Sequence, residues 1–191
     1  MLKQIRIAIV STVVATVFLG FLYPIAVTGI ARVLFPNQAG GSLIYKDGKP
    51  VGSRLIGQPF DDPKYFWSRL SATAPAPYNG AGSSGSNLGP INPALMKAVQ
   101  DRIDALLKAD PDNREPIPVD LVTASSSGLD PHITPAAAQY QAKRVARIRG
   151  ISESTVQSLI DKHMQGRFLG LFGEPAVNVL ELNLDLDTVK S

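Results

Sequence analysis

Hydrophobic residues are concentrated near the start of the chain, where no charged residue occurs from Ile7 to Ala31. As a helix with a rise of 1.5 Å per residue, this run would be roughly 37 Å long, which is enough to cross a hydrocarbon layer of about 30 Å with some tilt. A helix is the single-crossing form that satisfies all its backbone polar groups internally. The pattern therefore predicts a transmembrane helix, with Pro24 as a point of kinking near one end.

The charges that flank this run indicate its orientation. Lys3 and Arg6 precede it, and the first charge after it is Arg32. A basic flank favours the cytoplasmic side, so we expect the N-terminus in the cytoplasm. A cleaved signal peptide is the alternative, but its apolar core would span only about 7–15 residues and end at an Ala-x-Ala-like site. We therefore expect residues 1–35 to form an N-terminal tail and transmembrane helix in the cell (inner) membrane. Residues 36–191 are then an extracytoplasmic, periplasmic domain.

Two stretches of the domain have the alternating pattern or the turn residues of β-structure. Residues 36–41 are rich in turn formers and predict a flexible exit from the membrane. Strand-like runs at 43–45 and 51–56 are separated by Asp47-Gly48, a strong hairpin signal. Across residues 177–186 leucines alternate with polar residues, which predicts a half-buried strand. The alternating leucines of that strand are Leu180, Leu182, Leu184 and Leu186.

Helical spacing and capping residues predict about three helices in the domain. Asn92 can cap a helix that begins at Pro93 and carries apolar residues at helical intervals up to Leu107. Thr134 caps a second helix that ends at Gly150, and Ser152 starts a third. The fold class is therefore α+β, with a single N-terminal transmembrane helix followed by one small soluble domain of about three helices and a small sheet that includes a hairpin.

A segment without apolar periodicity lies between the hairpin and the first of these helices. Residues 57–70 concentrate aromatic side chains, which predict a core anchor or a short helix, or else an aromatic surface for a partner. Residues 71–92 are dominated by Gly, Pro, Ser and Asn. Loops of this length are usually functional, so we expect the loop to be mobile in the isolated domain and ordered by a partner. The partner-contact candidates are Tyr78, Asn79, Asn87 and Leu88 in the loop, with Gly20, Ala26 and Gly29 in the membrane helix, where small residues permit close helix packing.

Composition excludes several classes of function. Nineteen basic against sixteen acidic residues give a formal charge of +3, which is too mild to predict a nucleic-acid partner. The chain has no cysteine, which excludes disulfides, thiolate metal sites and cysteine nucleophiles. The two histidines, His132 and His163, lack the spacing of metal ligands. Gly80-Ala-Gly82-Ser-Ser-Gly85 fits G-x-G-x-x-G, but prolines on both sides replace the strand and helix that a dinucleotide site requires.

Two clusters of polar residues leave alternatives open. Ser125, Ser126, Ser127, Asp130 and His132 crowd into eight residues and include the residue types of a hydrolase relay, but residues so close in sequence more often bond to local backbone. We expect Asp130 and His132 to hold the loop that leads into the helix capped by Thr134. The basic residues from Lys143 to Arg149 form either a solvated helix face or a surface for a partner or lipid headgroups.

Taken in order, several segments resemble one family. They are DGKPVGSRLIGQPF, YFWSRLSA, SSGSNLGPIN, PVDLVTASSSGLDPHITPAAA, QAKRVARIRG and FGEPAVNVLELNLDLD, and they follow a single N-terminal span. This sequence is similar to KdpC, the C subunit of Kdp-type potassium-transporting P-type ATPases. The likeness runs through nearly the whole chain.

The resemblance implies an accessory, assembly and regulatory subunit of an ATP-driven, high-affinity potassium importer. Members are described as catalytic chaperones that raise the ATP affinity of the P-type subunit. The implied partners are a channel-like potassium-translocating subunit, a P-type ATP-hydrolysing subunit, a small single-span subunit and the lipid bilayer. The chain lacks the Asp-Lys-Thr-Gly-Thr motif of the ATP-hydrolysing subunit and is expected to be non-catalytic on its own. The resemblance implies ATP binding through the complex, and direct contact of this chain with the nucleotide is the alternative. A membrane-anchored extracytoplasmic hydrolase that uses Ser127, Asp130 and His132 is the alternative.

Overall fold

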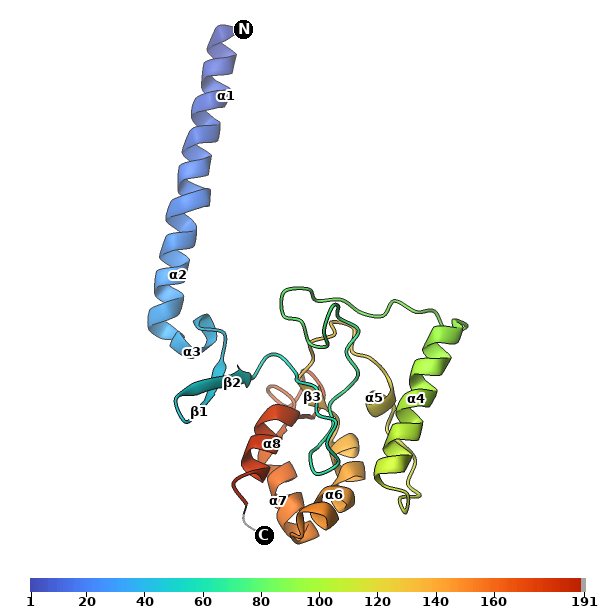
Figure 1. Cartoon of the computed structure of the whole chain (residues 1–191). Coiled ribbons are helices and arrows are strands. Elements are labelled where there is room, and N and C mark those ends of the chain that lie inside the picture. Colours follow the sequence, from blue (N-terminus) through green and yellow to red (C-terminus); the bar gives the residue numbers. More distant parts are fainter. Residues whose placement is uncertain (190–191) are drawn as a thin grey trace. The chain divides into compact units, whose positions relative to one another are not determined.

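The computed structural model describes residues 1–189 and is drawn in Figure 1. The chain forms two compact units, Met1–Val51 and the part that follows from Gly52. In chain order the helices and strands are α1 (Leu2–Ala15), η1 (Thr16–Leu22), α2 (Tyr23–Leu34), α3 (Pro36–Ala39), β1 (Leu43–Lys46), β2 (Lys49–Ser53), α4 (Pro93–Ala109), α5 (Val119–Val122), β3 (His132–Ile133), α6 (Pro135–Arg149), α7 (Glu153–His163), β4 (Met164–Gln165), β5 (Ala176–Asn178) and α8 (Val179–Leu186).

The first unit begins with the expected apolar helix. Elements α1, η1 and α2 follow each other without a break from Leu2 to Leu34, a length of 33 residues that includes an 18-residue window with a mean hydropathy of 2.2. By length and composition this helix can cross a membrane, which agrees with the span predicted for Ile7–Ala31. The turns of η1 are π-helical and end just before Pro24, which cannot donate a backbone hydrogen bond to the preceding turn. The hydroxyl of Ser11 donates to the carbonyl of Ile7, so this polar side chain is satisfied within the helix.

The exit from the apolar helix differs from the prediction, whereas the hairpin confirms it. Residues expected to be flexible form the single helical turn α3, which has a proline at its first position. Strands β1 and β2 then pair as a two-stranded sheet. Asp47 and Gly48 between them both have left-handed backbone angles, with φ of 50° and 73°, as a two-residue hairpin turn of the mirror-image type requires. The domain boundary predicted at residue 35 stays a prediction, because compactness does not mark where lipid ends.

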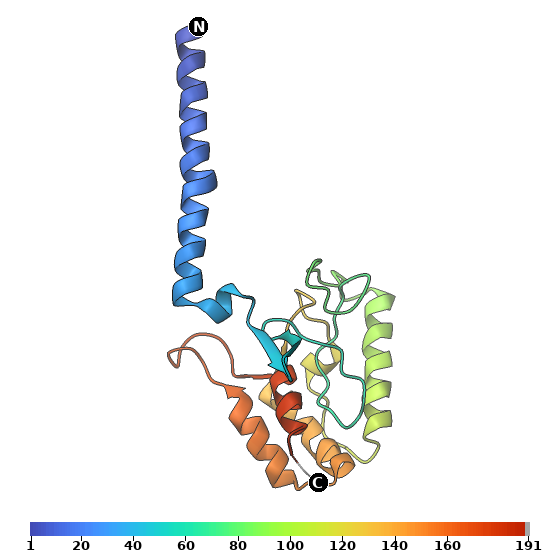
Figure 2. The same cartoon turned by 60° about the vertical axis from the view of Figure 1, so that its left-hand side comes forward.

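The second unit is an α+β domain in which helices surround a three-stranded antiparallel sheet of order β3-β5-β4. Val177 at the centre of this sheet pairs with Ile133 on one side and Met164 on the other. Helices α6, α7 and α8 pack together, as Figures 1 and 2 both show. The predicted helix starts are confirmed, since the side chains of the three cap residues accept hydrogen bonds from the first turns of α4, α6 and α7. These caps are Asn92, Thr134 and Ser152.

The predicted strand over residues 177–186 is wrong beyond Asn178, because the chain turns there into helix α8. The side chain of Asn178 accepts a hydrogen bond from the backbone N–H of Glu181 at 3.1 Å and caps the helix. The buried residues of α8 recur at helical intervals. They are Val179, Leu180, Leu182, Asn183 and Leu186. The alternating leucines are therefore compatible with both a strand and a helix, and in the folded domain the segment packs against α7 as a helix.

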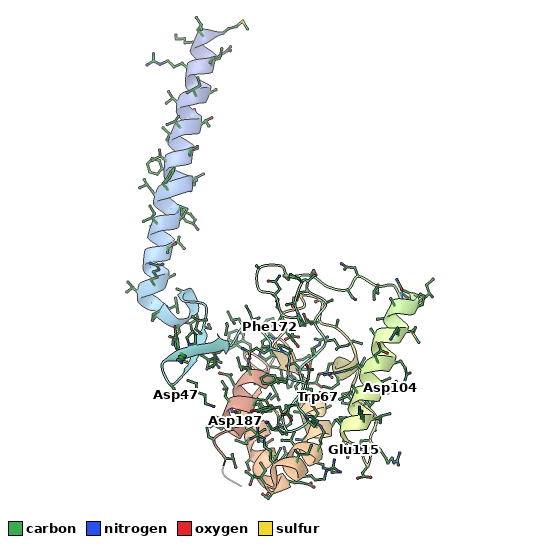
Figure 3. All side chains as sticks on the ribbon, viewed as in Figure 1. Asp47, Trp67, Asp104, Glu115, Phe172 and Asp187 are labelled. Atoms are coloured by element: carbon green, nitrogen blue, oxygen red, sulfur yellow. The ribbon has the colours of Figure 1, made fainter. Side chains whose placement is uncertain are left out.

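The aromatic segment 57–70 is a core anchor, as one of its two interpretations predicted, but it contains no helix. Phe66 and Trp67 are buried, and Figure 3 shows Trp67 inside the domain. The amide of Asn183 binds both the N–H and the C=O of Phe66, each at 2.9 Å. Gln141 binds the backbone of Trp67 in the same way, at 2.8 and 3.2 Å. Two buried amide side chains thus supply the backbone hydrogen bonds that a strand or helix would otherwise provide.

Candidate functional site

The two loops that carry the longest family-like motifs lie side by side. Residues 83–89 come from the long loop before α4, and residues 124–131 lead from α5 to β3. The backbone N–H of Ser84 and the hydroxyl of Ser83 both donate to the carbonyl of Ser127 at 3.0 Å. Figures 1 and 2 show both loops at the same end of the domain.

An open cleft of about 570 Å³ lies between these loops. Its lining is mostly small and polar. The residues that line it are Leu55, Arg69, Gly85, Ser86, Asn87, Ala124, Ser125, Ser126, Ser127, Leu129, Asp130 and Pro131.

Two glycines allow the loops to approach each other this closely. A Cβ atom on Gly85 would lie 2.7 Å from the carbonyl oxygen of Ser126, and one on Gly128 would lie 2.6 Å from that of Ser84. Gly128 also has a left-handed φ of 68°, which side chains other than glycine rarely adopt. The glycines therefore keep the two loops in backbone contact and set the width of the cleft.

An ion pair lies in the lining of the cleft. The guanidinium of Arg69 donates to a carboxylate oxygen of Asp130 at 2.9 Å. The other oxygen of Asp130 accepts the backbone N–H of His132 at 3.0 Å and lies 3.4 Å from its Nδ1. Burial alone would raise the pKa of Asp130, but the hydrogen bonds from His132 and the charge of Arg69 hold it below its usual value. As expected, Asp130 holds the loop that leads into α6.

Two buried donors in the cleft lining have no partner. Ser125 is only 3% exposed, and its hydroxyl has no hydrogen-bond partner within residues 1–189. The Nε of Arg69 is also buried and without a partner in this part of the chain. A buried donor left unpaired costs about 1–3 kcal/mol, so both groups favour a bound acceptor. Both residues line the cleft, but these two atoms are themselves enclosed, so an acceptor can reach them only if the side chains turn toward the cleft.

The three residues of the hydrolase alternative are not arranged as a relay. Asp130 and His132 are in contact, but the hydroxyl of Ser127 accepts the backbone N–H of Leu129 at 3.1 Å. Within the described residues it makes no hydrogen bond with His132. Ser127 therefore stabilises its own turn, as hydroxyls in such loops commonly do. The arrangement lacks the nucleophile–base contact of a Ser–His–Asp relay.

The predicted contact residues of the long loop fall into two groups. Tyr78 is buried, and its hydroxyl donates to the carbonyl of Arg69, while burial raises its pKa. Asn79 binds the backbone of its own loop through both ends of its amide. Asn87 is exposed and lines the cleft, next to the half-buried Leu88. Contact with a partner remains a prediction, and the exposed end of the loop is the part that can make it.

The first part of the long loop makes hydrogen bonds within itself and to the rest of the domain, and its mobility in the isolated domain stays a prediction. The hydroxyl of Ser71 donates to the carbonyl of Gly128 at 2.7 Å and accepts the N–H of Tyr78 at 2.9 Å. The hydroxyl of Thr73 donates to the carbonyl of Ala76 at 2.7 Å. Hydroxyl groups thus replace the apolar contacts that this segment lacks.

The basic side of α6 is largely paired within the domain. Lys143 contacts Glu115 at 3.0 Å, and Arg147 contacts Asp110 at 2.7 Å. Arg144 is buried, and its guanidinium lies 5.1 Å from the centroid of the Trp67 ring. Burial lowers the pKa of Arg144 to about 10. These pairings favour the interpretation of the basic side of α6 as a structural face over its interpretation as a surface that binds lipid headgroups.

Two other expectations concern metals and nucleotides. No group of three acidic or histidine side chains among residues 1–189 lies close enough to hold a metal ion. After Gly85 the next helix begins at Pro93, so the glycine motif does not open a helix as a dinucleotide-binding loop does. Sequence reasoning missed Arg69 and placed Ser125 only in the serine-rich cluster, because the significance of both residues depends on contacts between distant loops.

Comparison with known proteins gives full-length matches. The family model KdpC, described as K+-transporting ATPase, c chain, matches residues 5–188. The potassium-transporting ATPase KdpC subunit of Sorangium cellulosum is 60% identical over 187 residues, which cover 98% of this chain and 98% of that protein. The corresponding subunit of Ralstonia nicotianae is 61% identical over 186 residues, covering 97% and 91%. That of Methylococcus capsulatus is 57% identical over 190 residues, covering 100% of both chains. The similarity extends across both compact units.

Proposed function

The chain belongs to the KdpC family and is an accessory subunit of a potassium-transporting ATPase, and on this basis we propose that it regulates the pump by docking through the cleft between residues 83–89 and 124–131. The docked cleft contacts the channel-like potassium-translocating subunit near its external entrance. The P-type ATP-hydrolysing subunit and a small single-span subunit complete the complex.

The observation that carries this proposal is the pair of unpaired donors in the cleft. Ser125 Oγ and Arg69 Nε are both buried and without partners among the described residues, and both residues line the same cleft. Docking would turn these two enclosed side chains toward the cleft, where a backbone carbonyl or carboxylate of a partner subunit would accept hydrogen bonds from them. The free chain carries the cost of these two groups, and docking relieves it.

The proposed effect on ATP is indirect. Lys3 and Arg6 precede the apolar helix, which supports a cytoplasmic N-terminus and an extracytoplasmic domain. ATP is hydrolysed on the cytoplasmic side, so the domain raises ATP affinity by favouring one conformation of the complex and not by touching the nucleotide. Such coupling needs only a difference in docking affinity between two states of the pump.

The test is Ser125→Ala in the full chain, expressed with its partner subunits. Removing an unpaired buried hydroxyl leaves the free chain at least as stable as the wild type, because no hydrogen bond is lost. Docking loses one hydrogen bond, so we expect about three- to tenfold weaker co-purification with the pump and a higher KM for ATP.

A matched control is Ser158→Ala, on the exposed side of α7, where the hydroxyl bonds only to the carbonyl of Ser154 at 2.9 Å. It should change neither assembly nor ATP affinity. Unaltered co-purification and ATP affinity in Ser125→Ala would show that the cleft is not the docking site. A destabilised free chain would show instead that the hydroxyl has a structural partner.

A further inference from the structure

The most exposed apolar feature of the second unit is a short turn between β4 and β5. Phe168, Leu169, Leu171 and Phe172 are 70%, 75%, 76% and 63% exposed. With Gly170 they form the segment 168–172, here named the apolar tip. Figure 2 shows the loop that contains it projecting from the body of the domain, and Figure 3 labels Phe172. Four adjacent large side chains in solvent mark an interaction site, whereas single exposed residues need no explanation.

The apolar tip is a preformed structure. The N–H of Phe168 donates to the carbonyl of Phe172 at 2.8 Å, and the N–H of Phe172 donates back to the carbonyl of Phe168 at 3.0 Å. The N–H groups of Gly170 and Leu171 donate to the carbonyls of Arg167 and Phe168. Most backbone donors of the tip are therefore satisfied within it. Internal pairing of the backbone is important in lipid, where an unpaired N–H or C=O group costs several kcal/mol. It is less important in a protein interface, where the other protein can supply hydrogen-bond partners.

The charges near the tip are confined to its base. Arg167 and Glu174 form a two-contact ion pair at 3.0 and 2.8 Å, and no charged residue lies between them. The tip itself has no polar side chain with which to recognise a specific protein surface. Phenylalanine and leucine with a basic residue at the edge are typical of segments that lie in the membrane interface.

The chain already holds the domain at a bilayer. The apolar helix ends at Leu34, and the second unit begins at Gly52, so the tether keeps the tip at a high effective concentration near lipid. A weak apolar contact is then sufficient for occupancy. We propose that the apolar tip inserts into the headgroup and upper acyl region of the membrane and serves as a second attachment point of the domain.

The absence of cysteine makes a site-specific test direct. The full chain with Leu171→Cys carries a single environment-sensitive fluorophore and is reconstituted alone into phosphatidylcholine vesicles. Phospholipids with a nitroxide near the headgroup end of the acyl chain should quench this label more strongly than lipids with a nitroxide at the bilayer centre. The control is Ser158→Cys on α7, an exposed polar position, which neither lipid should quench.

A second variant separates insertion from an effect of the label. Leu169 has a left-handed φ of 53°, which aspartate tolerates better than leucine, so Leu169→Asp does not strain the turn. Its charge and the lost leucine should lower the membrane-inserted fraction by about tenfold or more. Equal quenching at positions 171 and 158 would overturn the proposal. So would a label at 171 that is shielded only when the other pump subunits are present, because a protein pocket would then cover the tip.

Discussion

Asn183→Ala tests whether a buried amide holds the aromatic segment in the core. Asn183 is 2% exposed, and its side chain accepts the N–H of Phe66 and donates to its C=O, both at 2.9 Å. Alanine leaves both backbone groups of the fully buried Phe66 unpaired. Each such group costs about 1–3 kcal/mol, so the free energy of unfolding should fall by about 2–6 kcal/mol. This is a large share of the stability of a typical domain, about 5–15 kcal/mol.

The assay is urea unfolding of the full chain in detergent, followed by tryptophan fluorescence. Trp67 is the only tryptophan and directly follows Phe66, so the signal reports on the same segment. With a slope of about 2 kcal/mol/M, the midpoint should fall by about 1–3 M. The control is Gln100→Ala, which removes an exposed amide that binds only Asp104 and should change stability by no more than about 0.5 kcal/mol. If Asn183→Ala behaves like this control, the amide does not replace the missing backbone pairing.

Three further predictions concern pH, assembly and topology. The pKa of Asp130 is lowered in the folded state, so its contribution to stability is present above the unfolded pKa of about 3.9 and is lost as the pH falls through the folded value. Asp130→Asn should therefore make the free energy of unfolding depend less on pH below about pH 4. An unchanged pH dependence would contradict the assignment. Gly20→Leu and Gly29→Leu should each reduce co-purification with partner subunits but leave membrane insertion intact, whereas unaltered complexes would make the helix a simple tether. A reporter fused after residue 191 should be active only in its extracytoplasmic form, and activity in the cytoplasm would reverse the proposed orientation.

Elements whose local signals are strong could be predicted from the sequence. Asn92, Thr134 and Ser152 each begin a helix, because a side-chain acceptor at that position satisfies a free N–H of the first turn. Asp47-Gly48 gave the hairpin, because both residues adopt left-handed angles there. In these cases a few neighbouring residues decide the conformation, so the surrounding fold adds little.

The segment 177–186 was predicted wrongly, because its leucines suit both a strand and a helix. One local signal favoured the helix. Asn178 precedes Glu181 by three positions, the spacing of a helix cap followed by an acidic residue in the first turn. The outcome also depended on Asn183, whose buried position is explained only by its contacts with Phe66. That partner is far away in sequence, so no local pattern could reveal it.

The candidate site, like the helix at 179–186, could not be predicted from local sequence patterns, because its residues meet only in the folded domain. The sequence marked both loops as unusual, but Arg69 and Ser125 become significant only when Gly85 and Gly128 bring the loops together. Within residues 1–189, three buried side-chain atoms lack partners, and two of these belong to residues that line this one cleft. A small domain gains stability by pairing or removing such atoms. Their concentration at one place supports the proposal that another molecule completes the cleft, and Ser125→Ala should separate stability of the chain from assembly of the pump.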